Sequence, residues 1–191
     1  MSFLKLQSIP AIDRDAINVI IETPKAQPSK FKYDPEHGIF RLEKLLPLGT
    51  VFPFDFGFVP STVGGDGDPM DALVLGMQAA PVGALILCEL TAVMEAEQTE
   101  NDKTERNDRF IVTPLDAKSR QPMRPKVQLD EPLINAINDF FVAYNQLQNK
   151  KFKSLGVHGA KRAHELLNEG MTRARDMERE KQFQKTKSAA S

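Results

Sequence analysis

The sequence predicts an α+β fold: a five-stranded OB-like closed β-barrel with packed α-helices. Short apolar segments separated by turn residues fill the chain as far as residue 114, and apolar residues at helical spacing follow. Strands that precede helices favour this arrangement over a parallel doubly wound sheet, in which the two alternate. The 191 residues, 41% of them hydrophobic, suffice for one core. We therefore expect a single domain over residues 1–175 and a charged tail over residues 176–191.

The first strands are predicted where β-branched and aromatic residues gather between turn signals. Residues 16–22 are rich in isoleucine and valine and are followed by prolines. Residues 30–34 and 39–43 flank the four-residue loop Pro35-Glu36-His37-Gly38, which is typical of a β-hairpin. Residues 52–59 mix aromatic side chains with proline and glycine, which indicates an irregular or edge strand. Further strands are predicted at residues 72–75, 84–97 and 109–113.

Two helices are predicted downstream. The first begins after Pro132, which suits a first helical turn, and a second begins near Gly159, with Gly170 as a weak point. From residue 172 the chain is charged and poor in apolar residues, so we expect a solvated helix that frays into a disordered end. The apolar positions of the first helix are Leu133, Ile137, Phe140, Phe141, Tyr144 and Leu147.

Composition narrows the class of protein. A formal net charge of −1 argues against general nucleic-acid binding. The single cysteine, Cys88, lies in an apolar run and predicts a buried thiol rather than a disulfide. No stretch approaches the roughly 20 apolar residues that span a bilayer, and the first 15 residues lack the apolar segment of a signal peptide. We therefore expect a cytoplasmic protein whose partners include neither membrane nor nucleic acid.

The most informative segment is Asp66-Gly67-Asp68-Pro69-Met70-Asp71, which places three carboxylates in one tight turn. Carboxylates this close repel one another, and a hard divalent ion such as Mg²⁺ or Mn²⁺ relieves the repulsion. A solvated acidic turn is the alternative, but apolar residues resume at once after Asp71, as at the mouth of a core strand. A calcium-binding EF-hand is excluded, because its fifth and twelfth positions would be Met70 and Met77.

Cationic residues near this turn indicate an anionic substrate. Lys30, Lys32 and Lys44 lie on or just after the predicted hairpin, and Arg106 and Arg109 lie beside the next acidic segment. Such cations neutralise outer phosphate oxygens while metal ions bridge the substrate to the protein, although surface ion pairing is the alternative for each lysine taken alone. The motifs of P-loop nucleotidases, serine hydrolases and zinc proteases do not occur.

With these residues in place, the chain resembles the soluble family I inorganic pyrophosphatases, whose signature D-[GSDN]-D-[PE]-hydrophobic-D is matched by residues 66–71. The resemblance covers residues 16–155 and implies an OB-like barrel that hydrolyses pyrophosphate to two phosphates. It further implies several Mg²⁺ ions, or Mn²⁺ in their place, and direct attack of a metal-activated water. Homo-oligomers, either trimers or hexamers, are implied as well. The segments that carry it beyond the signature are residues 20–22, 32–34, 52–58 and 140–144.

The resemblance also implies roles for individual residues. Asp66 and Asp71 would be metal ligands and Asp68 the general base, while Glu22 would bind a metal that arrives with the substrate. Asp34 stands at another ligand position, where the family has Glu. The remaining metal carboxylates are expected among Glu97, Asp102 and Asp108, with Asn107 as an alternative at one position, and the phosphate ligands are expected to be Lys32, Lys44, Arg109 and Tyr144.

Besides Asp34, three positions that concern the substrate clamp depart from the family pattern. Lys44 replaces a phosphate-binding Arg, Phe56 replaces a Tyr, and Asn145 replaces a phosphate-binding Lys. We therefore expect the metal core and the water activation to be kept and the substrate clamp to be altered, with reduced activity or a changed substrate as a consequence. Two alternatives to a pyrophosphatase are an OB-like nucleic-acid or nucleotide binding module without hydrolase activity, and a hydrolase of another phosphoanhydride.

Overall fold

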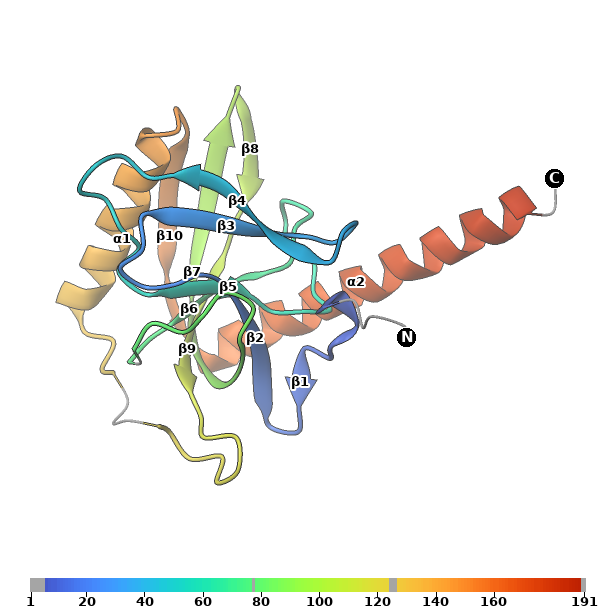
Figure 1. Ribbon diagram of the computed structural model, residues 1–191, viewed down its shortest axis with the longest axis horizontal. Coiled ribbons are helices and arrows are strands. Elements are labelled where there is room, and N and C mark those ends of the chain that lie inside the picture. The colour runs from blue at the N-terminus through green and yellow to red at the C-terminus, as the bar shows by residue number, and fades with distance from the viewer. Residues whose placement is uncertain (1–5, 77, 124–126, 190–191) are drawn as a thin grey trace.

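The computed structural model, which describes residues 6–76, 78–123 and 127–189, confirms the α+β class (Figure 1). A large sheet forms the body, a separate two-stranded hairpin lies over one end of it, and two helices pack against its faces. The elements in chain order are the 3-10 helix η1 (Leu6–Ser8), β1 (Ile12–Asp13), β2 (Ala16–Thr23), β3 (Ser29–Asp34), β4 (Ile39–Leu45), β5 (Asp55–Phe58), β6 (Asp71–Val74), β7 (Leu85–Glu100), β8 (Lys103–Arg106), β9 (Arg109–Pro114), α1 (Glu131–Gln146), β10 (Lys151–Gly159) and α2 (Ala160–Ala189).

Strand β2 joins two parts of the large sheet. It pairs antiparallel with β5, where Ile20 lies opposite Phe58, and also with β7, where Ile17 lies opposite Cys88. β5 then pairs with β6, β6 with β9, and β9 with β7, and of these only the β6–β9 pair is parallel. The pairings of these five strands therefore form an unbroken cycle. The closed OB-like barrel is a finer description that stays a prediction.

The predicted strands are present, with one change of role. The segment expected to be an irregular or edge strand is internal, because β5 pairs with β2 on one side and β6 on the other, and all four of its residues are buried. The mixture of aromatic and polar residues in this segment had indicated an edge strand, yet the side chains of Asp55, Phe56 and Phe58 are all buried. The hairpin of β3 and β4, with its four-residue loop, is confirmed.

Besides the two-residue β1, the strands β8 and β10 were not predicted. β8 has no buried side chain, and in β10 only Phe152 is buried, so neither has the apolar run that indicates a strand. Both form because β7 is long. Its far end, from Glu97 to Glu100, pairs with β8, and β10 pairs along residues 92–99 of β7.

The core has two main parts, one on each face of the sheet. On one face Val19, Val93 and Phe110 pack with Leu167 of α2, and on the other Met94 and Ile111 pack under α1. Alternate residues of a strand point to opposite faces, so neighbours such as Phe110 and Ile111 belong to different parts. Buried residues of α1 are Ile137, Phe141, Tyr144 and Asn145, and Cys88 is buried as predicted.

Helix α2 is longer and more continuous than predicted. It passes through Gly170 without a break, and it runs to Ala189, where its C-terminal half extends beyond the sheet (Figure 1). Gly170 is required by a close approach rather than being a weak point, because a Cβ there would collide with Met70 Sδ, and its carbonyl accepts a hydrogen bond from Val63 N at 3.0 Å. The division between residues 175 and 176 falls inside this helix and stays a prediction. Neither helix in the described ranges is long and apolar enough to cross a membrane.

A buried carboxylate anchors α2 to the sheet. Glu95 of β7 accepts a hydrogen bond from Arg162 Nε of α2 at 2.8 Å and another from Arg106 of β8. We call these three residues the Glu95 network. Hydrogen bonds from Arg162 and Arg106 lower the pKa of Glu95 to about 2. The charge of Glu95 is therefore fully compensated by cations of the chain itself.

Candidate functional site

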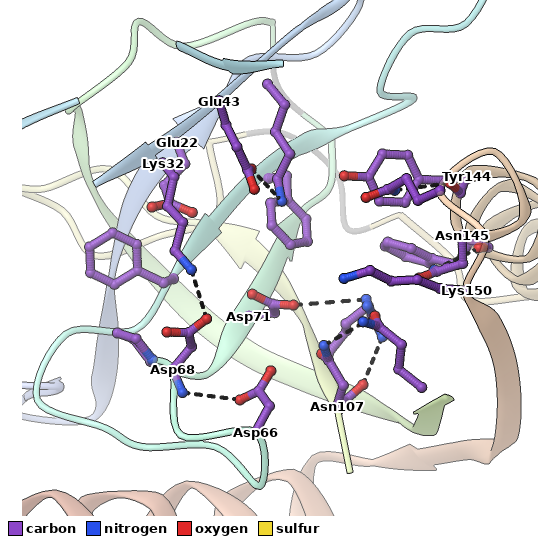
Figure 2. A pocket seen from close by; sticks show the side chains of 18 of the residues that line it. Glu22, Lys32, Glu43, Asp66, Asp68, Asp71, Asn107, Tyr144, Asn145 and Lys150 are labelled. Atoms are coloured by element: carbon purple, nitrogen blue, oxygen red, sulfur yellow. Dashed lines mark hydrogen bonds and ion pairs between the residues drawn. The ribbon is translucent and has the colours of Figure 1, made fainter. Parts of the chain in front are cut away.

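A cavity of about 420 Å³ opens between the β3–β4 hairpin, the turn before β6, the β7–β8 hairpin and the C-terminal end of α1 (Figure 2). Among the described residues, seven carboxylates and five cationic side chains line it. This density of opposite charges suits a highly charged ligand together with counter-ions. The carboxylates are Glu22, Glu43, Asp66, Asp68, Asp71, Glu100 and Glu105, and the cations are Lys30, Lys32, Lys44, Lys150 and Arg109.

Residues 66–71, here called the acidic turn, form one wall of the cavity. Asp68 N donates a hydrogen bond to Asp66 Oδ1 at 3.2 Å, and Gly64 N donates to the carbonyl of Asp68 at 2.7 Å, which closes the turn. Gly67 adopts a φ of +86°, a conformation that glycine takes without strain. β6 begins at Asp71, so the turn opens directly onto a core strand, as predicted.

Three carboxylates in this wall lack close cations. Burial raises the pKa of Glu22 and of Asp66, and it raises the pKa of Asp71 to about 7 despite the opposing charge of Arg109. The nearest cationic atom to Asp71 in the described ranges is Arg109 Nε, at 3.9 Å. Carboxylates that line one cavity and whose charge the chain leaves uncompensated suit a hard divalent ion such as Mg²⁺ or Mn²⁺. Glu22, Asp66 and Asp71 could therefore hold metal.

Arg109 forms the floor of the cavity. Its guanidinium carbon lies 4.2 Å from the ring centroid of Phe141 and 4.9 Å from that of Phe152, and its Nη1 donates to the carbonyl of Asn107 at 2.7 Å. The side chain is 4% exposed, and burial lowers its pKa. Nε has no hydrogen-bond acceptor among the described residues. A cation held this rigidly beside Asp71 presents a fixed positive charge to a ligand.

The other cations line the walls. Lys30 Nζ lies 2.9 Å from Glu43 Oε2, and Lys150 Nζ lies 2.9 Å from Glu100 Oε2. Lys44 of β4 donates to the side-chain oxygen of Gln148 and lies over the ring of Tyr144, 5.6 Å from its centroid. The buried hydroxyl of Tyr144 has no hydrogen-bond partner within the described ranges. A buried donor left unsatisfied by the protein points to a ligand that would accept its hydrogen bond. Lys32 Nζ lies 2.8 Å from Asp68 Oδ2.

The structure brings together eight of the predicted site residues. The acidic turn lies on one side with Glu22 and Lys32, and Tyr144 lies across from it (Figure 2). Lys44 and Arg109 line the same cavity. Phe56, Asn107 and Asn145 also line the cavity, at positions where the sequence departs from the family pattern or offers an alternative ligand. The eight residues are Glu22, Lys32, Lys44, Asp66, Asp68, Asp71, Arg109 and Tyr144.

The structure places the four other predicted metal ligands outside this cavity. Asp34 Oδ2 pairs with Arg41 Nε at 2.7 Å, next to the loop of the β3–β4 hairpin. Asp102 lies at the exposed tip of the β7–β8 hairpin. Asp108 Oδ1 accepts hydrogen bonds from Ala96 N at 2.9 Å and from Arg106 at 2.8 Å. Glu97 neighbours Gln98, which does line the cavity, and successive side chains of a strand point to opposite faces.

Several lining residues were not singled out from the sequence. Gln98 and Glu100 alternate along β7, and Glu105 comes from β8, so the period of two could have identified them had the hairpin been predicted. Glu43 and Lys150 carry no motif of their own. They reach the cavity because β4 pairs with β3 and because β10 follows the end of α1.

Comparison with known proteins agrees with this geometry. The model of the family described as inorganic pyrophosphatase matches residues 19–175. The inorganic pyrophosphatase of Rickettsia felis is 32% identical over 167 residues, which cover 85% of this chain and 94% of the relative. That of Saccharolobus solfataricus is 32% identical over 148 residues, covering 76% and 84%. The crystal structure of the Thermus thermophilus inorganic pyrophosphatase superposes with a TM-score of 0.77 at 26% identity, covering 90% of this chain and 99% of that one.

Proposed function

The chain belongs to the inorganic pyrophosphatase family, and from that membership we propose that it hydrolyses pyrophosphate to two phosphates in this cavity, with Mg²⁺ as the metal or Mn²⁺ in its place. The observation that carries the proposal is the contrast within the cavity lining. Glu22, Asp66 and Asp71 are carboxylates without close cations, whereas Arg109 and Tyr144 offer donors without close acceptors. Metal ions and a phosphate ligand would satisfy both sets together.

In the proposed mechanism Glu22, Asp66 and Asp71 would hold the metal ions. When bound, divalent ions supply Lewis acidity, which lowers the pKa of a water molecule toward neutral and neutralises charge on the phosphate. The raised pKa of Asp71, caused by burial, supports this role, because a cation would stabilise its ionised form. The metal-binding roles expected for Asp34, Glu97, Asp102 and Asp108 stay predictions, because none of the four lines this cavity. Asp108 comes nearest to it, since it lines a small neighbouring pocket with Asp66 and Asp71.

Asp68 would act as the general base. Its side chain is 58% exposed and lines the cavity beside Asp66 and Asp71, so it can reach a water molecule there. It would accept the proton that the attacking water loses as the new bond to phosphorus forms and the bond between phosphorus and the bridging oxygen breaks. Gly67 and the hydrogen bond between Asp68 N and Asp66 Oδ1 keep its carboxylate on this wall.

The remaining polar side chains would bind and orient the phosphates. Arg109, rigid between two aromatic rings, would hold one group from the floor, and Lys44 and Tyr144 would hold it from the α1 side. Lys32 would reach the phosphate that lies nearest to the acidic turn. Charged donors of this kind stabilise the negative charge that builds up on the leaving phosphate.

A longer phosphoanhydride is a second candidate substrate. Asn145, Gln148 and Lys150 also line the cavity, and Phe56 contributes no hydroxyl to it. These residues leave polar and cationic lining on the side away from the acidic turn, which suits a third phosphate group. An oligonucleotide is disfavoured, since seven of the twelve charged groups that line the described cavity are negative.

Four finer points of the sequence analysis remain proposals. The cycle of β2, β5, β6, β9 and β7 would be the five-stranded OB-like barrel. The protein would form a single domain with a charged tail from residue 176. It would work in the cytoplasm, and it would assemble as a trimer or hexamer.

Release of phosphate from pyrophosphate, measured with and without Mg²⁺, tests the proposed function. ATP and tripolyphosphate are assayed alongside at equal concentration. Rapid release from pyrophosphate that requires Mg²⁺ is the expected result. Release from tripolyphosphate that exceeds release from pyrophosphate would favour the second candidate, and silence on all three substrates would contradict both.

A further inference from the structure

Lys32 does not lie free in the cavity. Its Nζ contacts Asp68 Oδ2 at 2.8 Å, and this ion pair joins β3 to the acidic turn across 36 positions of the chain (Figure 2). The other oxygen of Asp68, Oδ1, has no hydrogen-bond donor within the described ranges. The polypeptide thus supplies a cation to one oxygen of one particular carboxylate in the turn.

The neighbouring carboxylates of the acidic turn have no cation as close as Lys32 is to Asp68 in the described ranges. Within the described ranges no lysine or arginine pairs with Asp66, which accepts the backbone N–H of Asp68, and Arg109 comes no closer to Asp71 than 3.9 Å. Both are more buried than Asp68 and face the interior of the cavity, whereas Lys32 and Asp68 lie at its rim, 50% and 58% exposed. Since a lysine ammonium and a divalent ion compete for the same carboxylate oxygen and repel each other, the ion pair separates one oxygen ligand from the rest.

We propose that, before the substrate binds, Lys32 is a positioning residue, a tethered cation that occupies Asp68 in place of a divalent ion. The inference rests on the proposed function, in which metal ions bind in this cavity. Lys32 directs the metal to the side of Glu22, Asp66 and Asp71, and leaves Asp68 Oδ1 open to accept a proton. It thereby determines which carboxylates of the turn bind metal and which one does not.

Titration of the purified protein with Mn²⁺, followed by calorimetry in the absence of pyrophosphate, tests this proposal. Wild type is compared with Lys32→Met, Asp68→Asn and the double variant. Lys32→Met frees the Asp68 carboxylate from its ion pair, and this uncompensated charge should tighten Mn²⁺ binding by about tenfold, or add one ion per chain. The effect should vanish in the double variant, because Lys32 acts through Asp68, and Lys32→Arg should behave as wild type.

Lys118→Met serves as the matched control, since Lys118 is an exposed lysine that does not line the cavity. The ion pair is half-exposed, so these variants should fold, and circular dichroism verifies it. Mn²⁺ binding to Lys32→Met within twofold of wild type would overturn the proposal. The proposal would also be overturned if adding Lys32→Met to Asp68→Asn tightened Mn²⁺ binding as much as Lys32→Met does in wild type. Phosphate release from pyrophosphate is measured separately. If wild type releases phosphate but Lys32→Met binds Mn²⁺ as wild type does, the proposed role of Lys32 is wrong and the proposed function stands.

Discussion

The acidic turn and the Glu95 network are two ways of burying carboxylates in one molecule. In the Glu95 network, two arginines donate to one carboxylate, and their hydrogen bonds lower its pKa to about 2. In the acidic turn, burial instead raises the pKa of Asp71 to about 7, and the nearest arginine stays 3.9 Å away. The pKa of Glu95 is thus lowered and the pKa of Asp71 is raised, although the two kinds of carboxyl group have similar ordinary pKa values.

The difference separates a structural role from a functional one. A buried charge must be compensated, and where the chain supplies the cations the result is a link between elements, here between β7, β8 and α2. Where the chain supplies no close cation, the carboxylates keep an uncompensated charge, which the proposed metal ions would neutralise. Variants of the two regions should therefore fail in different assays, and four predictions test this.

Asp68→Asn should cause the largest change in turnover. The amide cannot accept the proton of the attacking water, so turnover of pyrophosphate should fall by about 10²-fold or more. The free energy of unfolding should change little, because the side chain is 58% exposed. Phosphate release and urea denaturation measure the two quantities, with Asp139→Asn, an exposed carboxylate of α1, as the control. Full turnover by Asp68→Asn would remove the proposed base.

Glu95→Gln should show the reverse pattern. Arg106 and Arg162 would each lose one of two carboxylate partners and keep only Asp108 and Glu165. The free energy of unfolding should fall by about 2 kcal/mol at pH 7, given that both arginines are partly exposed. The pKa of Glu95 is lowered, so its contribution is present above pH 4.5 and is lost as the pH falls toward 2. Urea denaturation across this range should show the variant and wild type converging. A constant difference at all pH values would contradict the electrostatic origin.

Asp71→Asn should stabilise the metal-free protein. A carboxyl whose pKa is raised to about 7 is ionised at pH 8 at a cost to the folded state, and this cost disappears as the pH falls through 7 toward 4. In EDTA the variant should exceed wild type by about 4 kcal/mol in free energy of unfolding at pH 8, and match it near pH 4. Mg²⁺ should stabilise wild type and leave the variant unchanged. Equal stabilisation of both by Mg²⁺ would exclude Asp71 as a ligand.

Tyr144→Phe should give the smallest effect. The buried hydroxyl has no partner in the described ranges, so its removal should leave the free energy of unfolding within about 0.5 kcal/mol of wild type. Loss of a hydrogen bond to phosphate should raise KM for pyrophosphate by about fivefold. Steady-state kinetics and urea denaturation together check it. A destabilised variant with unchanged KM would place the hydroxyl in the fold rather than in the site.

Prediction from the sequence succeeded where the signal is local. β2, the β3–β4 hairpin and α1 each carry their own apolar spacing and turn residues, and the acidic turn is contiguous. Prediction was incomplete for strands that are stabilised by pairing with a neighbouring strand rather than by their own buried side chains. β8 and β10 have few buried side chains, and they exist because β7 extends to Glu100 and offers them a partner edge. The placement of Gln98 and Glu100, rather than Glu97, in the cavity depends on that same pairing.

The sequence by itself determined the chemistry that six adjacent residues can perform, because Asp66, Asp68 and Asp71 are held near one another by the chain whatever surrounds them. Only the tertiary structure decided how each charge is compensated. Lys32 lies 36 positions before Asp68 and Arg162 lies 67 positions after Glu95, and no local pattern links such partners. Strand pairing and helix packing bring them within hydrogen-bonding distance. Burial and partner distance then determine whether a carboxylate joins structural elements or remains available to bind an ion.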